Sequence, residues 1–304
     1  MLVYYLLIWP FSRLPLFILY GLSYVVYFVL RSVLGYRKQV INANIKRVFP
    51  EFTDKQVKDL RHRNYRHLSY LVAEGIRNLG IGKKELKRRM HLENPELFER
   101  LYAEGKSVML ISSHFENWEF FITAQSLLMP HQAMGIGKKI KKAYLNTKIN
   151  GLRERFGMEV IHNRNYRERI EAAMAQSPVA VLTLSDQSPA PDHAYWTKFF
   201  GVDTPFAYGP EFMAHLFDMT VVYLDIQLVK RGHYKAVPTL LFSDVKGLKH
   251  GEIMEALIAK QEEQICRRPE AWLWSHKRWK LNKPADFASL RAEQKARFDS
   301  KFGR

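Results

Sequence analysis

Cysteine is nearly absent from this chain of 304 residues, and Cys266 is the only one. A single cysteine excludes an intrachain disulfide framework and a zinc site built on CxxC pairs. We interpret Cys266 as a small core residue rather than a reactive thiol. The zinc-binding patterns HExxH and HxxxH are also missing, and the histidines are scattered along the chain. We therefore expect no metal site.

Motifs that bind nucleotides or supply a nucleophile are missing as well. The sequence has no GxxxxGK[ST] phosphate loop and no GxGxxG fingerprint, since Gly135 and Gly137 give only a partial match. It also lacks the GxSxG turn that exposes a catalytic serine, and Ser112 and Ser113 fall at the end of an apolar run. We therefore expect neither a bound cofactor nor a covalent serine intermediate.

Charge is scarce at the N-terminus, where Arg13 is the only charged residue within 1–30. As a helix, the uncharged stretch 14–30 would extend about 26 Å, close to the roughly 30 Å hydrocarbon core of a bilayer. It predicts a membrane anchor over residues 1–35 that either spans the bilayer or lies in its plane. A cleaved signal peptide fits less well because the chain has no basic n-region before the apolar residues and no clear small-residue cleavage site. The alternative is an apolar helix that belongs to a soluble core.

Positive charge dominates the rest of the chain, with a net charge of +17 and an isoelectric point near 9.8. Such a surface attracts phosphates on lipids, carriers or nucleic acids. Basic residues follow the apolar stretch closely, so the positive-inside rule predicts that everything downstream lies in the cytoplasm. These residues are Arg31, Arg37, Lys38, Lys46 and Arg47.

From residue 36 onward the chain reads as one domain, because no Ser/Gly-rich linker or internal repeat interrupts it. A helix is expected first, with Thr53 or Asp54 as its N-cap. From Ser107, short apolar runs then alternate with amphipathic helical stretches. This alternation predicts an α/β fold with a largely parallel central sheet flanked by helices. The apolar runs are 107–113, 132–137, 158–162 and 178–185.

The run 220–242 predicts two strands joined by a turn at Arg231 and Gly232. A late helix is expected over 250–268. In an open α/β sheet, ligands bind beyond the carboxyl ends of the strands. His114 and Asp186 each follow a predicted strand, so both are expected at that edge.

The segment HFENWE, residues 114–119, combines a base with a carboxylate at this edge. A histidine is a suitable general base when a carboxylate fixes its tautomer. We expect His114 on the turn and Glu119 in the first turn of the next helix, where the two could meet. Glu116 is the competing carboxylate, expected to be solvated or to interact with the helix N-terminus. Because the H-x4-E pattern alone is common, a capping or core histidine with a surface glutamate is the alternative.

Several segments resemble, in the correct order, the late acyltransferases of lipid A biosynthesis, within the wider lysophospholipid acyltransferases that carry an H-x4-D/E motif. The resemblance extends to about Lys283. It departs at Ser188, where the family has a second acidic residue, and Thr204 and Gly209 keep a further family segment only loosely. The segments are SSHFENWE (112–119), RERFGMEVIHNR (153–164), LSDQSP (184–189) with KFFGVDTPFAYGPEFMAH (198–215), and RRPEAWLWSHKRWK (267–280).

This family transfers secondary acyl chains onto Kdo-lipid IVA. The resemblance implies an acyltransferase domain over 36–304, on the cytoplasmic face of the inner membrane, that uses acyl carrier protein or CoA thioesters and no further cofactor. It implies that His114 takes the proton of an acceptor hydroxyl and that Glu119 orients His114. The substrate-binding residues that it implies are Arg153, Arg155, Arg164, Asp186 and Gln187.

Alternative acceptors and functions remain at this stage. Enzymes that O-acylate ornithine or glycine aminolipids, or other lysolipids, share the motifs. A glycerophospholipid acyltransferase is disfavoured because the FPEGTR motif of that branch is missing. A more distant alternative is a non-enzymatic basic protein that binds membranes or nucleic acid, but no zinc finger, helix-turn-helix or RNP signature supports it. We expect an anionic lipid as partner and no nucleic acid.

Overall fold

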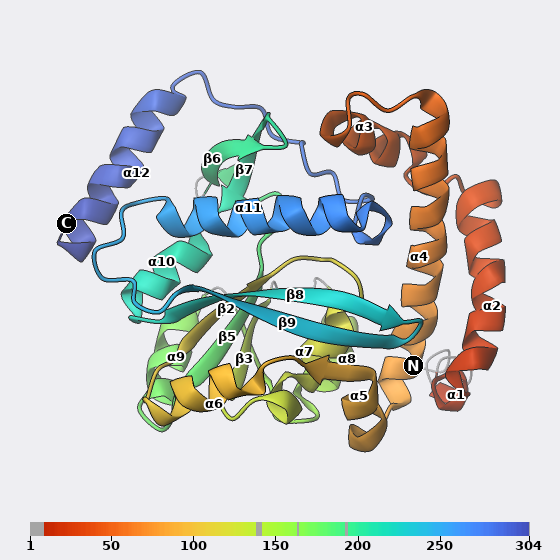
Figure 1. Cartoon of the computed structure of the whole chain (residues 1–304), viewed down its shortest axis with the longest axis horizontal. Coiled ribbons are helices and arrows are strands. Elements are labelled where there is room, and N and C mark those ends of the chain that lie inside the picture. Colours follow the sequence, from red (N-terminus) through yellow and green to blue (C-terminus); the bar gives the residue numbers. More distant parts are fainter. Residues whose placement is uncertain (1–8, 138–141, 163, 192–193, 304) are drawn as a thin grey trace.

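A central seven-stranded sheet organises the molecule (Figure 1). The computed structural model describes residues 9–137, 142–162, 164–191 and 194–303. Neighbouring strands in the order β1-β9-β8-β2-β5-β3-β4 are parallel, except for the antiparallel pair β8–β9. The predicted α/β fold with a largely parallel sheet is confirmed. The strands are β1 (Met90–Leu92), β2 (Val108–Ser112), β3 (Gln132–Gly137), β4 (Glu159–His162), β5 (Val179–Leu184), β8 (Thr220–Lys230) and β9 (His233–Phe242).

The centre of the sheet is buried on both faces, as the continuous apolar runs predicted. Every residue of β2 is buried, and alternate side chains enter different cores. Met109 and Ile111 join a cluster beneath the helices α3, α4, α9, α10 and α11, whereas Val108 and Leu110 join a second cluster beneath α5, α6 and α7. The helices are α3 (Lys38–Val48), α4 (Asp54–Gly80), α5 (Lys83–Arg89), α6 (Pro95–Ala103), α7 (Trp118–Leu128), α8 (Ala143–Glu154), α9 (Tyr166–Met174), α10 (Gly209–Leu216) and α11 (Glu252–Arg267).

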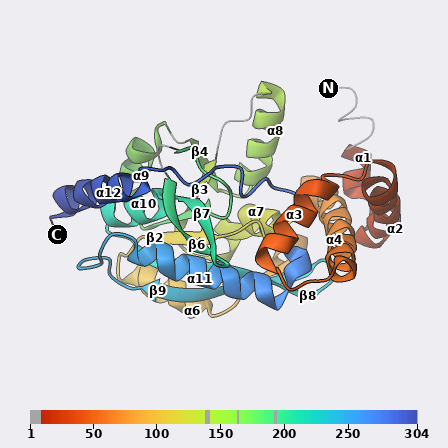
Figure 2. The same cartoon turned by 90° about the horizontal axis from the view of Figure 1, so that it is seen from above.

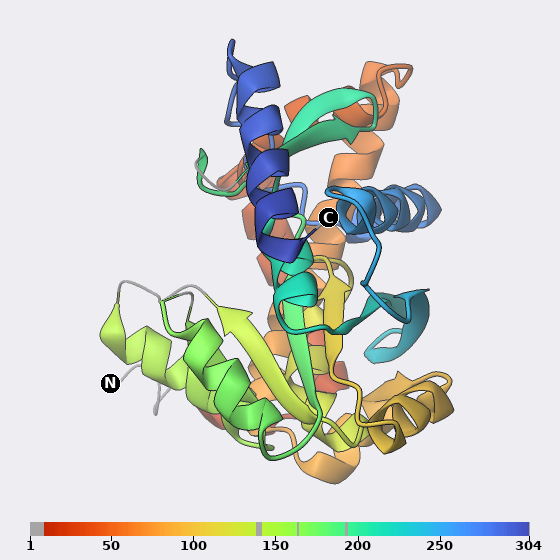
Figure 3. The ribbon, with the colours of Figure 1, turned by 90° about the vertical axis from the view of Figure 1, so that its left-hand side faces the viewer.

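A hairpin and a last helix lie outside the central sheet, and neither was predicted. Strands β6 (Ala194–Phe199) and β7 (Val202–Ala207) form a separate antiparallel pair. Figure 3 shows this hairpin beside α12 (Phe287–Phe302). Figures 1 and 2 place α12 at the opposite end of the molecule from the N-terminal helices.

The N-terminal helices pack against α4 rather than standing apart from the domain. After α1 (Trp9–Arg13), helix α2 (Leu16–Phe28) runs along α4 and continues into a π-helical turn, Val29–Val33 (Figures 1 and 2). The stretch Leu16–Val33 has the length and composition of a membrane span, and 22% of it is buried. The boundary at residue 35 between an anchor and an acyltransferase domain stays a prediction.

Two local predictions have opposite outcomes. The N-cap of α4 is confirmed, because Thr53 and Gln56 form a reciprocal capping box. The core interpretation of Cys266 is wrong, since this residue is exposed on α11. The helix buries Gln264 and Ile265, and the 100° step to the next position turns Cys266 toward solvent.

Candidate active site

His114 and Asp186 meet because their strands are parallel neighbours. Ser112 at the end of β2 pairs with Leu184 at the end of β5, so the residues two positions further on lie side by side. The backbone N–H of His114 donates a hydrogen bond to Asp186 Oδ1 at 3.0 Å, and the imidazole Nδ1 lies 2.7 Å from the same oxygen. The predicted placement of both residues at the strand ends is confirmed, whereas their direct contact was not predicted.

The surroundings of Asp186 select its ionised form. Burial opposes the charge, but His114 and the indole N–H of Trp272, which donates to Oδ2 at 3.0 Å, lower the pKa of Asp186 to about 2. An ionised acceptor next to Nδ1 places the ring proton on that nitrogen. The Nε2 atom of His114 is therefore the basic nitrogen.

The basic nitrogen faces a polar neighbour. The side-chain amide of Gln187 lies 3.1 Å from Nε2 and donates to it, and the ring of Trp118 meets the imidazole edge-on with centroids 5.1 Å apart. The side chain of His114 is 18% exposed, so it is accessible from outside the protein. An acceptor hydroxyl can reach Nε2 by taking the place of the Gln187 amide.

Glu119 does not make the expected contact with His114. It lies in the first turn of α7 as predicted, but its carboxylate accepts hydrogen bonds from the guanidinium of Arg153 on α8. Asp186 occupies the orienting position instead, because β5 carries it to Nδ1 from the neighbouring strand. The expected His114–Glu119 contact is therefore wrong, while a catalytic role for either residue stays a prediction.

The predicted arginines separate into different environments. Arg153 is partly buried against Glu119. Arg155 donates to the carbonyls of Asn78 and Leu79, which lie at the end of α4 and lack partners within the helix. Arg164 is exposed after β4. Only Arg153 is thus joined to the H-x4-E segment.

Glu116 is buried, so the expectation that it is solvated is wrong. Its side chain is 1% exposed and lies 2.9 Å from Arg268 Nη1 and 3.9 Å from His67 Nδ1. The residue has a left-handed backbone with φ of 49°, which turns it inward under the loop. Burial raises the pKa of Glu116 to about 8, despite the opposing charge of Arg268.

The segment 267–280 forms hydrogen bonds that hold the loop of Asp186 in place, a role that was not predicted from the sequence. Trp272 donates to Asp186, and His276 Nε2 accepts a hydrogen bond from the backbone N–H of Ser188 at 3.1 Å. Burial lowers the pKa of His276 to about 4, so its imidazole is neutral at physiological pH. Asn64 on α4 donates to two backbone carbonyls of the segment. The closely spaced tryptophans were the available signal, but their spacing does not reveal a partner distant in sequence.

Arg278 is a buried cation without a hydrogen-bond partner among the described residues. It is 1% exposed, and its guanidinium lies 4.3 Å from the ring centroid of Phe206. Burial lowers its pKa to about 9, partly offset by the charge of Asp186, so the group stays protonated at neutral pH. Sequence reasoning placed Arg278 in a motif without assigning it a role.

The serines before His114 have structural contacts. Ser112 Oγ donates to the carbonyl of Leu224 at 2.7 Å, and Ser113 Oγ donates to Gln264 Oε1 at 2.5 Å. Both side chains are buried, so neither is placed as a nucleophile. Within the part of the chain that the structure describes, no cluster of three His, Cys, Asp or Glu residues could bind a metal ion.

Comparisons with known proteins identify the family of the chain. The bacterial lipid A biosynthesis acyltransferase family matches residues 2–281. The chain is 20% identical over 288 residues to the lipid A biosynthesis palmitoleoyltransferase of Escherichia coli, covering 93% of this chain and 91% of that protein. The lipid A biosynthesis acyltransferase of Shigella flexneri shows the same identity and coverage. The chain thus belongs to the bacterial lipid A biosynthesis acyltransferases and is an acyltransferase enzyme.

Proposed function

We propose that the protein transfers a fatty acyl chain from an acyl thioester to a hydroxyl of a lipid A precursor. The pairing of His114 with the buried carboxylate of Asp186 carries the proposal, because it leaves Nε2 as a positioned base. The relatives support a lipid A precursor as the acceptor, since their names specify lipid A biosynthesis. The donor is an acyl carrier protein or CoA thioester, and no further cofactor takes part.

Two proton transfers complete the reaction in this proposal. Nε2 of His114 removes the proton of the acceptor hydroxyl as its oxygen attacks the thioester carbonyl carbon. Asp186 stabilises the imidazolium that forms. When the tetrahedral intermediate collapses, the carbon–sulfur bond breaks and the leaving thiolate takes the proton from the imidazolium. The products are an ester and a free thiol.

Glu119 and Arg153 have a supporting role in this scheme. Their ion pair is partly exposed, with side chains 31% and 23% accessible. A planar guanidinium is suited to phosphate oxygens or to a developing oxyanion. We infer that Glu119 orients Arg153 toward an anionic part of the substrate. Arg164 is exposed and can add a second, weaker contact, whereas Arg155 is occupied by the end of α4.

We further infer attachment to the cytoplasmic face of the inner membrane. The apolar helix α2 and the basic residues after it support this location. Each basic residue near an anionic surface contributes about 1 kcal/mol, so high salt should weaken attachment without abolishing it. Complete release by salt alone would show that the apolar face of α2 is not inserted.

A purified enzyme assay tests the function. The protein is mixed with an acyl carrier protein thioester and a phosphorylated lipid A precursor, and the lipids are analysed by mass spectrometry. We expect a mass increase of one acyl chain on the precursor, and none with His114→Ala. Acylation of an aminolipid but not of the precursor would overturn the proposed acceptor. Loss of the lipid A product in a deletion strain would give independent support.

A further inference from the structure

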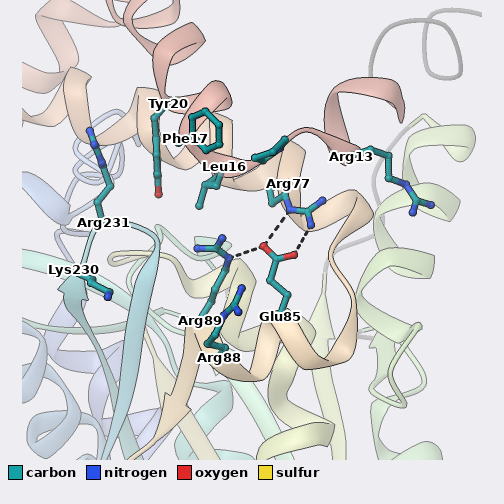
Figure 4. A pocket seen from close by; sticks show the side chains of 11 residues that line it. Arg13, Leu16, Phe17, Tyr20, Arg77, Glu85, Arg88, Arg89, Lys230 and Arg231 are labelled. Carbon is teal, nitrogen blue, oxygen red and sulfur yellow. Dashed lines mark hydrogen bonds and ion pairs between the residues drawn. The ribbon is translucent and has the colours of Figure 1, made fainter.

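A basic pocket of about 640 Å³ lies between the N-terminal helices, α5 and the turn that joins β8 to β9 (Figure 4). Its lining does not include His114, Asp186 or Gln187, so it is distinct from the candidate active site. The lining residues are Arg13, Pro15, Leu16, Phe17, Tyr20, Arg77, Glu85, Arg88, Arg89, Lys230 and Arg231.

The pocket has six cationic side chains and one carboxylate. That carboxylate, Glu85, is already bound by Arg77 and Arg89, as the dashed lines in Figure 4 show. Arg88 and Lys230 are exposed and have no side-chain hydrogen bond or ion pair with the described residues. The pocket therefore gathers positive charge that the described protein does not neutralise, and a phosphate supplies the missing charge.

The turn that carries two of these cations is fixed against α2. Gly232 has φ of +75°, and a Cβ there would lie 2.6 Å from Tyr20 Oη and 2.7 Å from a methyl carbon of Leu16. Only glycine permits this approach. The hydroxyl of Tyr20 is in turn bound to the buried carboxylate of Glu74 at 2.5 Å. The turn that carries Lys230 and Arg231 is thus held by a packed scaffold rather than by a loose surface loop.

An outward apolar surface begins at the pocket rim. Phe17 lines the pocket and is 75% exposed, and along the same helix Tyr24, Val25 and Phe28 are also exposed. Contacts near both ends of α2 join it to α4. Tyr20 donates a hydrogen bond to Glu74, and the guanidinium of Arg66 lies 5.6 Å from the ring centroid of Tyr27. A helix with an apolar outer face and cations at its edge is typical of an interfacial helix that lies in the membrane plane.

We propose that this pocket binds the phosphate of an anionic membrane phospholipid while α2 lies along the bilayer surface. Arginine forks bind phosphate oxygens in pairs, and Lys230 adds a point charge. The exposed apolar face of α2 enters the acyl region beside the bound headgroup. The pocket thus orients the enzyme on the membrane independently of its lipid substrate.

Vesicle flotation with the full-length protein tests the proposal. Neutral vesicles contain phosphatidylcholine alone, and in anionic vesicles about a quarter of the lipid is phosphatidylglycerol. The double variant Arg88→Gln/Lys230→Gln removes two exposed cations of the pocket that have no ion pair with the described residues. The matched control, Arg100→Gln/Lys249→Gln, removes one exposed arginine and one exposed lysine outside the pocket. Binding does not require turnover, so the result is independent of the proposed acyl transfer.

For each protein, the gain is the ratio of its partitioning onto anionic vesicles to its partitioning onto neutral vesicles. We expect this gain to be at least about tenfold smaller for the pocket variant than for the wild type. The control should stay within about twofold of wild type, and neutral vesicles should bind all three proteins equally, because α2 is unchanged. Equal losses in both variants would show diffuse attraction and overturn the proposal. A third arm measures thermal stabilisation by inorganic phosphate at constant ionic strength. One outcome would assign the pocket to a soluble phosphate compound instead. In that outcome phosphate stabilises the wild type but not the pocket variant, while the pocket variant keeps the wild-type gain on anionic vesicles.

Discussion

Asp186 receives two hydrogen bonds from His114 through one oxygen atom, one from the backbone N–H and one from the imidazole Nδ1. The backbone contact fixes the distance between the two residues, and the side-chain contact fixes the ring orientation. Trp272 occupies the other carboxylate oxygen and prevents the group from turning away. The basic Nε2 is therefore oriented before a substrate binds.

This relationship predicts that Asp186→Asn and His114→Ala both lower kcat by about 10² to 10⁴. The asparagine can present an amide N–H to the ring, which favours the tautomer with its proton on Nε2 and removes the base. Steady-state kinetics on purified protein measure the effect, and circular dichroism checks that the fold is retained. Wild-type turnover in either variant would refute the assignment of His114 as the base with Asp186 as its partner.

The arginines predict a graded response to substitution. We expect Arg153→Ala to lower kcat/KM at least about tenfold with a phosphorylated precursor, because a charge-assisted contact contributes about 1.5 to 3 kcal/mol. Arg164→Ala should have a smaller effect, since an exposed ion pair contributes well under 1 kcal/mol. Arg155→Ala should instead lower the melting temperature by exposing the unpaired carbonyls that end α4.

A dephosphorylated precursor is the matched control for this series. It should shrink the Arg153→Ala penalty if that side chain contacts phosphate, and leave it unchanged if the guanidinium serves the oxyanion. Small, equal effects of all three substitutions would place the arginines on a merely solvated surface.

Arg278 predicts opposite effects on stability and activity. A buried cation without a hydrogen-bond partner is costly, so Arg278→Met should raise the free energy of unfolding by on the order of 1 to 3 kcal/mol. If this charge serves the site beside Asp186, the same change should lower kcat, and Arg278→Lys should restore part of it. Chemical denaturation and kinetics on the same preparations test both effects. A parallel loss of stability and activity would make Arg278 a packing residue over Phe206.

The central sheet could be predicted from the sequence, but the side-chain contacts within the candidate active site could not. Continuous apolar runs such as 107–113 predict buried parallel strands because both faces of such a strand are covered. Those runs do not reveal which strands are neighbours in the sheet. Nothing local therefore indicated that β5 lies beside β2 and that Asp186, rather than Glu119, contacts Nδ1 of His114. Glu116 was misplaced for a similar reason: its left-handed backbone and its ion pair with Arg268 depend on tertiary packing. Trp272 likewise acts across a large sequence separation.

Glu116 predicts a specific pH dependence of stability. Its pKa is raised by burial from 4.5 to about 8, so the folded state binds a proton that the unfolded state releases in this range. The stabilising contribution is therefore complete below about pH 4.5 and is lost as the pH rises through about 8. Glu116→Gln keeps the shape of the neutral side chain and removes this titration.

We expect the melting temperatures of the wild type and of Glu116→Gln to agree near pH 5. Near pH 9 the variant should be more stable than the wild type by a few kcal/mol, since one pKa unit corresponds to about 1.4 kcal/mol. Scanning calorimetry across this range measures the difference. Parallel curves for the two proteins would mean that Arg268 keeps Glu116 ionised throughout.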